Sequence, residues 1–151
     1  MAQLVSIDPE ALSNGDLVIS LKNIKEKIYK NPEQALIIRT LPNPESRLKK
    51  NYSGTNPVYL QKEAAEFIRK TGIDHLLVDQ PSVDREQDEG KLLAHKEFWN
   101  YPSNPRIKAT ITEFIFVPSS IPDGKYFINI QIASLENDAS PSKILLFDIL
   151  T

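Results

Sequence analysis

Cysteine is absent from the 151 residues, and the chain has only two histidines, His75 and His95. The lack of cysteine excludes disulfides, thiolate metal ligands and a cysteine nucleophile. Two imidazoles also exclude a metal site that takes three histidines from one chain. Any site chemistry must therefore use oxygen and nitrogen ligands.

Long apolar runs and a strong excess of one charge are also missing. The longest apolar stretches, such as residues 35–38 and 144–147, are far shorter than the roughly 20 residues of a transmembrane helix. Residues 1–5 lack the basic and apolar blocks of a secretory signal, so we expect a cytoplasmic protein. The chain has 18 basic and 20 acidic residues, which are interspersed. Without a basic field, neither nucleic acid nor a membrane is expected as a partner.

The composition is that of a globular protein, with 40% hydrophobic and 25% charged residues. A chain of this length can bury one substantial core but is too short to divide comfortably into two domains. We therefore expect residues 1–151 to form a single soluble α/β domain.

The first two thirds of the chain alternate between strand and helix patterns. Strands are predicted at residues 4–7, 17–19, 35–38 and 73–78, and helices at residues 21–30, 61–71 and 91–98. Residues 35–38 form a continuous apolar run, which is typical of a central strand covered on both faces. Ser20 is a favourable N-cap for the first helix, and Gly72 suits the left-handed position after the second.

The last third is predicted to be mostly β. Strands are expected at residues 109–117, 126–133 and 144–150, and the turn at residues 122–124 favours adjacent positions for the first two. The sheet is expected to contain Leu36, Leu76, Ile115, Ile130 and Leu146, with the helices packed on it. Residues 41–58 include three prolines and form a loop too long to be a simple connector.

Several polar residues could carry chemistry, and each has an ordinary structural interpretation. His95 lies near the C-terminal end of its predicted helix, where composition alone favours a partly buried or capping histidine. His75 lies within a strand pattern, which favours a structural role still more. Glu113 is a lone acid in a β-rich run and could be a functional group or an outward-facing strand residue. Ser82 precedes Asp84 by two positions with no histidine near in sequence, so a turn is favoured over a nucleophile.

Two further features suggest ligands only weakly. Residues 84–89 contain four acids among six residues, but they lack the spacing and central glycine of a calcium-binding loop. A solvated acidic loop is the better interpretation. Gly54 has no second glycine at phosphate-loop spacing, so nucleotide binding has almost no support.

Several strings together resemble the cyclase-like metal-dependent hydrolases, the family that includes bacterial kynurenine formamidase and isatin hydrolase. The most specific is residues 72–84, GIDHLLVDQPSVD, which is similar to the family element GVxLIGIDxPSVD. Shorter similarities are found in ALIIRT (35–40), LLAH (92–95), TEF (112–114), DGKY (123–126) and DASPS (138–142). The resemblance extends over most of the chain.

This resemblance implies a swivelling β/β/α fold in which a mixed sheet is flanked by helices, usually assembled as dimers or higher homo-oligomers. It also implies hydrolysis of amide or lactam bonds of a small molecule, as in N-formylkynurenine formamidase, with bound zinc or manganese. His95 and Glu113 match family metal ligands. They are 18 positions apart (113 − 95), a longer gap than usual, and the excess falls in residues 100–106. We expect both side chains to face a common space.

The family's principal metal-binding string, similar to HxGTHxDxPxH, has no match in this sequence. By resemblance it would lie upstream of Met1, so the chain corresponds to the C-terminal portion of the fold, through a truncated gene, a misplaced start or a partial fragment. Two hypotheses follow: a metal-dependent hydrolase with an incomplete active site, or a non-catalytic remnant that serves binding or assembly. His95 and Glu113 fall short of the about three ligands of a catalytic zinc. The chain alone is therefore expected to retain little metal and to be inactive, and robust turnover would move the site, for instance to Asp79, Asp84 and His75.

Overall fold

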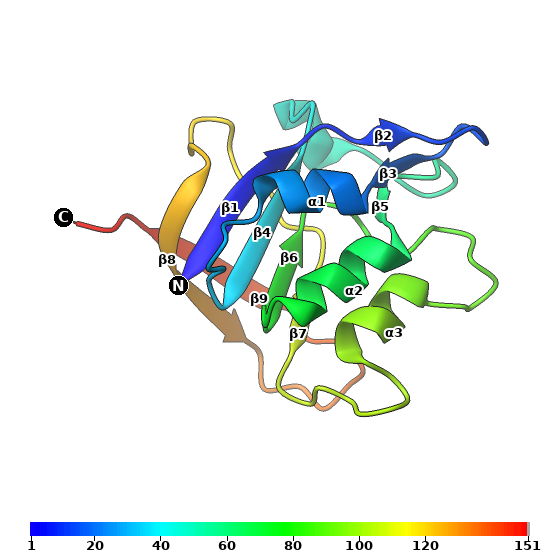
Figure 1. The fold of residues 1–151 in the computed structure, drawn as a ribbon. Coiled ribbons are helices and arrows are strands. Elements are labelled where there is room, and N and C mark those ends of the chain that lie inside the picture. The colour runs from blue at the N-terminus through cyan, green and yellow to red at the C-terminus, as the bar shows by residue number, and fades with distance from the viewer. Residues whose placement is uncertain (151) are drawn as a thin grey trace.

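The computed structural model describes residues 1–150, which form a six-stranded sheet, a three-stranded sheet and three α-helices (Figure 1). The strands are β1 (Ala2–Ile7), β2 (Glu10–Ala11), β3 (Leu17–Ile19), β4 (Ala35–Thr40), β5 (Tyr59–Leu60), β6 (His75–Val78), β7 (Thr110–Thr112), β8 (Gly124–Ile132) and β9 (Ser142–Phe147). The helices are α1 (Leu21–Lys27), α2 (Lys62–Lys70) and α3 (Leu93–Trp99), with a 3-10 helix, η1, at Glu45–Lys49. Within residues 1–150, no helix has the length and apolar character needed to cross a bilayer.

The larger sheet is mixed, with the strand order β7-β6-β4-β1-β8-β9. Strands β1, β4, β6 and β7 are parallel, whereas β8 is antiparallel to both β1 and β9. All six residues of β4 are buried between β1 and β6, which confirms the central strand predicted from its apolar run. The expected sharing of one sheet is also confirmed for Leu36, Leu76, Ile130 and Leu146.

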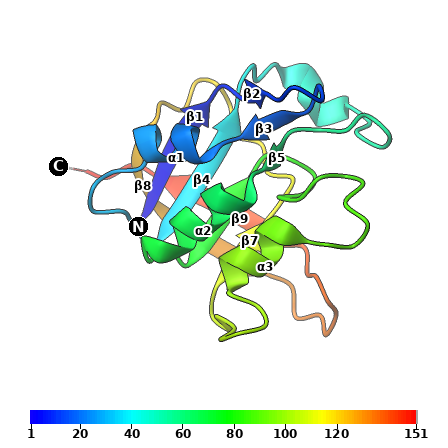
Figure 2. The same cartoon turned by 45° about the vertical axis from the view of Figure 1, so that its right-hand side comes forward.

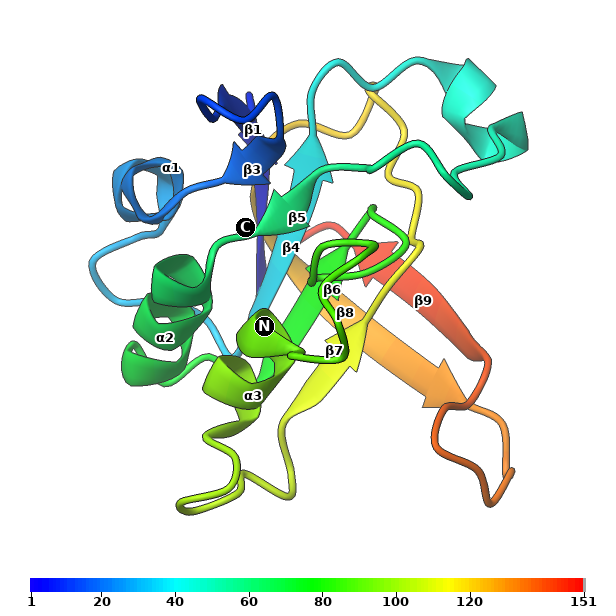
Figure 3. The same cartoon turned by 90° about the vertical axis from the view of Figure 1, so that its right-hand side faces the viewer.

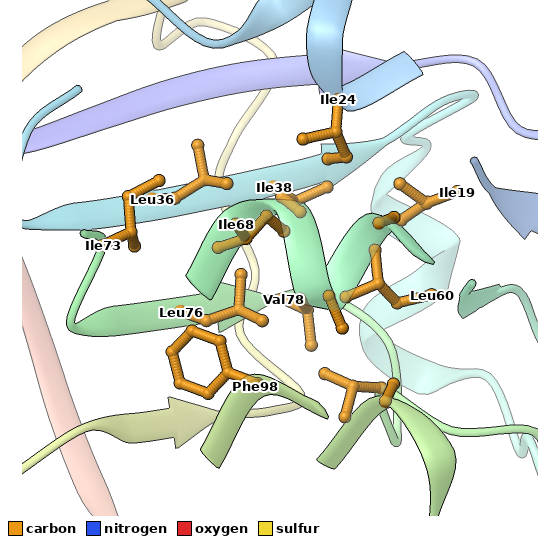
Figure 4. Close-up of a cluster of buried hydrophobic side chains, with 14 of the residues drawn as sticks. Ile19, Ile24, Leu36, Ile38, Leu60, Ile68, Ile73, Leu76, Val78 and Phe98 are labelled. Atoms are coloured by element: carbon orange, nitrogen blue, oxygen red, sulfur yellow. The ribbon is translucent and has the colours of Figure 1, made fainter. Parts of the chain in front are cut away.

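One face of this sheet is covered by the three helices. The close-up in Figure 4 shows side chains of β4 and β6 meeting Ile68 of α2 and Phe98 of α3. All of these side chains are almost completely removed from solvent. This cluster is the main hydrophobic core, and it holds α3 against the sheet.

The other face is covered by a ribbon made of β8 and β9. Residues 124–126 of β8 pair with β1, but residues 127–132 pair only with β9, so the ribbon crosses the sheet (Figure 3). Its inward side chains, Ile128, Ile130, Ile144 and Leu146, pack on Leu4 and Ile37 of the parallel strands and are only partly buried. The layers are therefore ribbon, sheet and helices, which matches the expected β/β/α arrangement.

The predicted neighbourhood of the strands at 109–117 and 126–133 is wrong. Strand β7 contains only Thr110–Thr112 and lies at the opposite side of the parallel strands from β8. Phe114 has a φ of 62°, which interrupts an extended strand. Ile115 therefore lies beyond β7, although its backbone N–H still donates to the Val78 carbonyl.

The ends of the first two helices show what sequence patterns can and cannot place. Ser20 caps α1 as predicted, with its Oγ accepting from the Asn23 N–H. However, α1 ends at Lys27 and not at residue 30, because the Gln3 side chain donates to the Lys27 carbonyl and accepts from the Tyr29 N–H. Gly72 follows α2 with a φ of 87°, as predicted for its left-handed position.

The long loop at residues 41–58 returns to the body of the protein through β5. Strand β5 pairs with β3, and β3 with β2, to form a small second sheet that the sequence patterns did not predict as a unit (Figure 2). The final strand, β9, ends at Phe147, three residues before the predicted end.

Candidate metal centre

The carboxyl ends of β6 and β7 bring the candidate residues together. Residues 79–84 leave β6, and Glu113 directly follows β7, its parallel neighbour. Since parallel strands end at the same edge of a sheet, both segments reach one edge, which in open α/β sheets is where ligands bind. Helix α3 carries His95 to the same place.

Helix α3 begins at Leu93, so His95 lies in its first turn and not near its C-terminal end as predicted. Leu92 and Leu93, at the start of the predicted helix, are 45% and 47% exposed, whereas Ala94 and Phe98 are buried. The Asp84 carboxylate accepts the backbone N–H of Ala94 at 2.6 Å. This buried acid therefore satisfies a free donor at the start of the helix, where negative charge is also favourable.

The two nitrogens of the His95 ring face two different carboxylates. Nδ1 lies 2.6 Å from Asp84 Oδ2, and Nε2 lies 3.4 Å from Glu113 Oε1. Because Asp84 also accepts backbone N–H groups and is an acceptor when ionised, we assign the proton of the neutral ring to Nδ1. The Nε2 lone pair then points toward Glu113. The expected common space of His95 and Glu113 is thus present in the structure.

The environment adjusts the acidity of both partners. Burial disfavours the charged form of His95, but the hydrogen bond to Asp84 and the charge of Glu113 outweigh it, so the pKa of His95 is raised above its ordinary value. Burial likewise opposes ionisation of Asp84, yet hydrogen bonds from His95 and the Ala94 N–H lower its pKa. Asp84 is therefore ionised at neutral pH.

Glu113 lies just outside a strand, so the interpretation as an outward-facing strand acid is wrong. Its Oε1 accepts the Val83 backbone N–H at 2.8 Å, which ties the end of β7 to the loop after β6. The side chain keeps 29% of its surface exposed. The carboxylate is therefore held in place while part of it remains accessible to a ligand.

The donor set fits part of a metal centre. His95 Nε2 and the Glu113 carboxylate are a nitrogen and an oxygen ligand of the kind that zinc and manganese accept. A carboxylate on the far nitrogen of a ligating histidine is a common outer partner that fixes the ring. Within residues 1–150, however, no group of three or more histidine, cysteine or acidic residues is arranged to hold a metal. The described chain thus offers two ligands, short of the about three of a catalytic zinc site.

The alternative site at Asp79, Asp84 and His75 is excluded by the geometry. His75 begins β6, at the opposite end of the strand from both acids, and its Nδ1 lies 2.9 Å from Thr110 Oγ1. Asp79 is buried and bonded to Thr40 and Arg47.

Ser82 has the turn role favoured by the sequence. Its Oγ accepts the Asp84 backbone N–H at 3.1 Å. Within residues 1–150 it has no histidine as a hydrogen-bond partner, and a serine nucleophile needs such a base.

The prediction of a solvated acidic loop at 84–89 is wrong for Asp84, which is buried, whereas Glu86 and Glu89 are exposed as predicted. The exposed Glu86 carboxylate also accepts the backbone N–H groups of Gly54 and Asn56. Asp88 accepts the N–H of Leu92. These acids organise neighbouring backbone, which charge density in the sequence does not reveal.

The contact between Asp84 and His95 is the feature of this site that local patterns in the sequence did not predict. Asp84 stands 11 positions from His95, too far for any helical or strand spacing to connect them. The sequence placed Asp84 at the end of the PSVD string and in an alternative site with Asp79 and His75, but it did not connect Asp84 with His95.

Open space lies on both sides of the site. A cavity of about 430 Å³ is lined by Ser82, Asp84 and Phe114, together with Tyr52 from the long loop. Leu92 lines this cavity and also a groove of about 440 Å³, which is lined by His95 as well. Both volumes are within the range of small-molecule sites.

A family model described as Putative cyclase matches residues 1–85, more than half of the chain. The chain belongs to this Cyclase family. No curated protein matches it.

Two solved structures share the fold. One, described as a potential metal-dependent hydrolase with cyclase activity, has a TM-score of 0.69 and 18% identity, and the match covers 99% of this chain and 65% of that one. The other, a predicted metal-dependent hydrolase from Bacillus stearothermophilus, has a TM-score of 0.67 and 18% identity, with 96% and 62% covered. The chain thus spans just under two thirds of the length of these structures.

Proposed function

We propose that Asp84, His95 and Glu113 form part of the divalent metal centre of a cytoplasmic hydrolase that cleaves amide or lactam bonds in a small molecule. The observation that carries this proposal is the His95 ring, whose Nδ1 is held by Asp84 and whose Nε2 faces Glu113. The description of both similar structures as metal-dependent hydrolases supports it.

Each residue has a separate role in this proposal. His95 Nε2 and the Glu113 carboxylate bind the ion, either zinc or manganese, while Asp84 holds the ring in the tautomer that leaves Nε2 free. When bound, a divalent cation polarises a carbonyl and activates water for attack on it. The loop amide of Val83 keeps Glu113 turned toward His95.

The remaining ligands would come from outside residues 1–150. With two ligands this chain should bind zinc weakly, lose it on dialysis, and show no detectable hydrolysis of N-formylkynurenine. A longer form that carries a paired-histidine segment would bind metal tightly. Metal-dependent turnover by the 151-residue chain would contradict the incomplete site.

Calorimetric titration of the chain with zinc chloride tests the proposed ligands. Glu113→Gln keeps an oxygen that can accept the Val83 N–H but removes the charge, so zinc binding should fall below detection while the fold is retained. Glu89→Gln is the matched control, because that carboxylate is 81% exposed and pairs only with Lys91 among residues 1–150. Equal zinc affinity of wild type and Glu113→Gln would refute the role of Glu113.

A non-catalytic remnant of the fold is the second candidate, and the convergence of only two ligand side chains among residues 1–150 favours it. The same titration separates the two candidates. Zinc binding that depends on both His95 and Glu113 supports the hydrolase. Complete absence of zinc binding, with intact circular dichroism, supports the remnant.

We further propose that the chain forms a homodimer or higher homo-oligomer through the outer face of the β8–β9 ribbon. Phe127 and Phe147 are paired across the two strands, and each is 53% exposed beside the exposed Leu145. Light scattering should show the oligomer in the wild type and a monomer for Phe127→Ser with Phe147→Ser. Leu135→Ser, in the loop between the strands, is the control. A monomeric wild type would contradict this interface.

A further inference from the structure

Phe114 combines two unfavourable features in one residue. Its φ of 62° lies in the left-handed region, which a bulky side chain seldom adopts. Its side chain is also 61% exposed, so burial of the ring does not compensate for the backbone conformation. Residues kept in such conformations concentrate at functional sites, and Phe114 directly follows the candidate ligand Glu113.

The conformation of Phe114 adds one residue to the pairing of β7 with β6. The Thr110 N–H donates to the Asp74 carbonyl. In a parallel ladder every second residue repeats this step, so the N–H of Phe114 would meet the Val78 carbonyl. In the structure Ile115 donates to Val78 instead, at 3.2 Å. Phe114 is therefore the extra residue of a β-bulge, a feature that redirects side chains beside functional sites.

The bulge changes the face of the sheet on which the next side chain packs. Ile111 packs in the cluster on the helix side, and by strand alternation Glu113 faces the same side, where His95 lies. Ile115 would also face that side in a regular strand, but it packs in the cluster under the β8–β9 ribbon. The extra residue thus lets one short segment turn a carboxylate toward α3 and an apolar side chain into the opposite layer.

The ring of Phe114 is supported by Tyr52, from the long loop at residues 41–58. The two ring centroids are 5.5 Å apart at an interplanar angle of 74°, which is an edge-to-face contact. Tyr52 is itself fixed, because its hydroxyl accepts from Arg47 Nε at 3.1 Å and Arg47 is paired with the buried Asp79. The free energy of an aromatic contact is of the same order as the cost of a left-handed backbone, so this contact favours the bulge by enough to maintain it.

We propose that Phe114 is a positioning residue: the bulge that it forms, held by Tyr52, keeps the Glu113 carboxylate facing the candidate metal centre. This inference rests on the proposed function, in which the position of Glu113 decides metal affinity. It extends the site to the long loop, because Tyr52 acts on Glu113 through Phe114.

Amide hydrogen exchange, measured by NMR on the metal-free chain, tests this coupling. The Val83 N–H donates to Glu113 Oε1 and the Ile115 N–H donates to β6, so both amides report on the bulge. Tyr52→Leu removes the ring contact and should make both amides exchange about fivefold faster, the factor that corresponds to the loss of one aromatic contact. The amide of Ile37, in the central strand β4, should stay unchanged, since a general loss of stability would accelerate its exchange as well.

Changes at Phe114 separate the effect of the ring from that of the backbone. Glycine adopts positive φ readily, so Phe114→Gly should keep wild-type protection without the ring and should restore protection when combined with Tyr52→Leu. Phe114→Val keeps an apolar side chain, but a branched Cβ disfavours the left-handed region, so both amides should exchange faster. Tyr52→Phe keeps the ring and should match the wild type. Tyr29→Leu, at a tyrosine that is 42% exposed after α1, is the control and should have no effect.

Unchanged exchange in Tyr52→Leu, or fast exchange that Phe114→Gly does not restore, would overturn the inference. Zinc titration extends the test to the candidate metal centre: affinity should fall about fivefold in Tyr52→Leu and return in the double variant. A wild-type chain that binds no zinc but shows the expected exchange pattern would reject the proposed function and leave the positioning of Glu113 intact. Zinc binding to the wild type with unaltered affinity in Tyr52→Leu would reject the role of Phe114 and leave the proposed function standing.

Discussion

Asp79 and Asp84 are two buried acids five residues apart at the same edge of the sheet, yet they are used differently. Asp79 accepts from the backbone and hydroxyl of Thr40, from the Gln80 amide and from Arg47 Nη1 at 2.8 Å. Asp84 accepts from the start of α3 and from the His95 ring. The Asp79 carboxylate is fully occupied by hydrogen-bond donors of the protein. The Asp84 carboxylate holds Nδ1 of His95, and the second ring nitrogen, Nε2, stays available.

The difference lies in the partner and not in the acid. Arg47 is always charged and has no acceptor, so its pair with Asp79 can only fix the long loop against β4 and β6. Histidine has two distinct nitrogens, so holding one of them orients the other. The two buried acids therefore differ in what their partners can still do: Arg47 has no acceptor to offer a ligand, whereas His95 keeps Nε2 available.

Removing the partner of Asp79 should have the largest effect on stability. Arg47→Met leaves a buried carboxylate without its counter-charge, which costs about 3–5 kcal/mol of unfolding free energy. Urea denaturation measures this loss, and Lys49→Met in the same 3-10 helix is the exposed control. A loss as small as that of the control would mean that the loop is held by other contacts.

Changing Asp84 should affect metal affinity more than it affects the fold. Asp84→Asn can still accept the Ala94 N–H, but it weakens the hold on the His95 ring, and zinc affinity should fall about 10–100-fold. Zinc titration measures the affinity, and nitrogen NMR of His95 reports which ring nitrogen carries the proton. Asp138→Asn, on the exposed hairpin loop, should change neither. If Asp84→Asn bound zinc as tightly as the wild type, Asp84 would have no role in metal binding and would not differ from Asp79 in this respect.

A third buried acid, Asp16, extends the comparison to pH. The hydrogen bond from Arg85, supported by Asn56 and Tyr59 and opposed by burial, holds the pKa of Asp16 well below its usual range. A lowered pKa adds stability that is present above the unfolded-state pKa of about 3.9 and is lost as the pH falls below it. Unfolding free energy of the wild type should therefore decline as the pH falls below about 5 and continue to decline toward the much lower pKa of folded Asp16, and Asp16→Asn should decline less steeply. Parallel curves for the two proteins would exclude this contribution.

The smallest effect is expected at Ser82, between the two acids. Ser82→Ala removes one hydrogen bond to the Asp84 N–H and should cost about 0.5–1.5 kcal/mol. Zinc affinity should stay at the wild-type value, because Ser82 contacts neither proposed ligand. A large loss of zinc binding would show that the turn, and not Asp84 alone, positions His95.

Local patterns predicted elements where one physical signal dominated. The apolar run at 35–38 identified the central strand, and Ser20 and Gly72 marked a helix start and a helix end correctly. Patterns failed where a feature outside the local repeat determined the structure. The Gln3 side chain binds the Lys27 carbonyl at the end of α1, and the positive φ of Phe114 interrupts the expected strand at 109–117. The pairing of β8 with β1, and not with β7, depends on residues more than 100 positions apart.

The candidate site shows the same division. His95 and Glu113 were identified through the family resemblance. In the structure His95 Nε2 lies 3.4 Å from Glu113 Oε1, and the role of both residues in metal binding stays a prediction. The ordinary interpretation of His95 as a partly buried residue agrees with the structure, although its expected place near the C-terminal end of a helix was wrong. The interpretation of Glu113 as an outward-facing strand acid was wrong, because Glu113 lies beyond the end of β7. The predicted helix at residues 91–98 begins two residues before the observed start at Leu93, and both Leu92 and Leu93 are exposed.

By itself, the sequence determined the class of fold, the central strand and the limits on ligand chemistry, because these follow from composition and from contacts between near neighbours. Only the tertiary structure decided that Asp84 orients His95, that Glu113 turns inward from the end of β7, and that residues 101–109 form a groove beside them. Each of these depends on hydrogen bonds or packing between segments that meet after the sheet forms. Such contacts cannot be predicted from local periodicity. The number of residues between their partners depends on how the chain folds in three dimensions and not on the repeat of a helix or a strand.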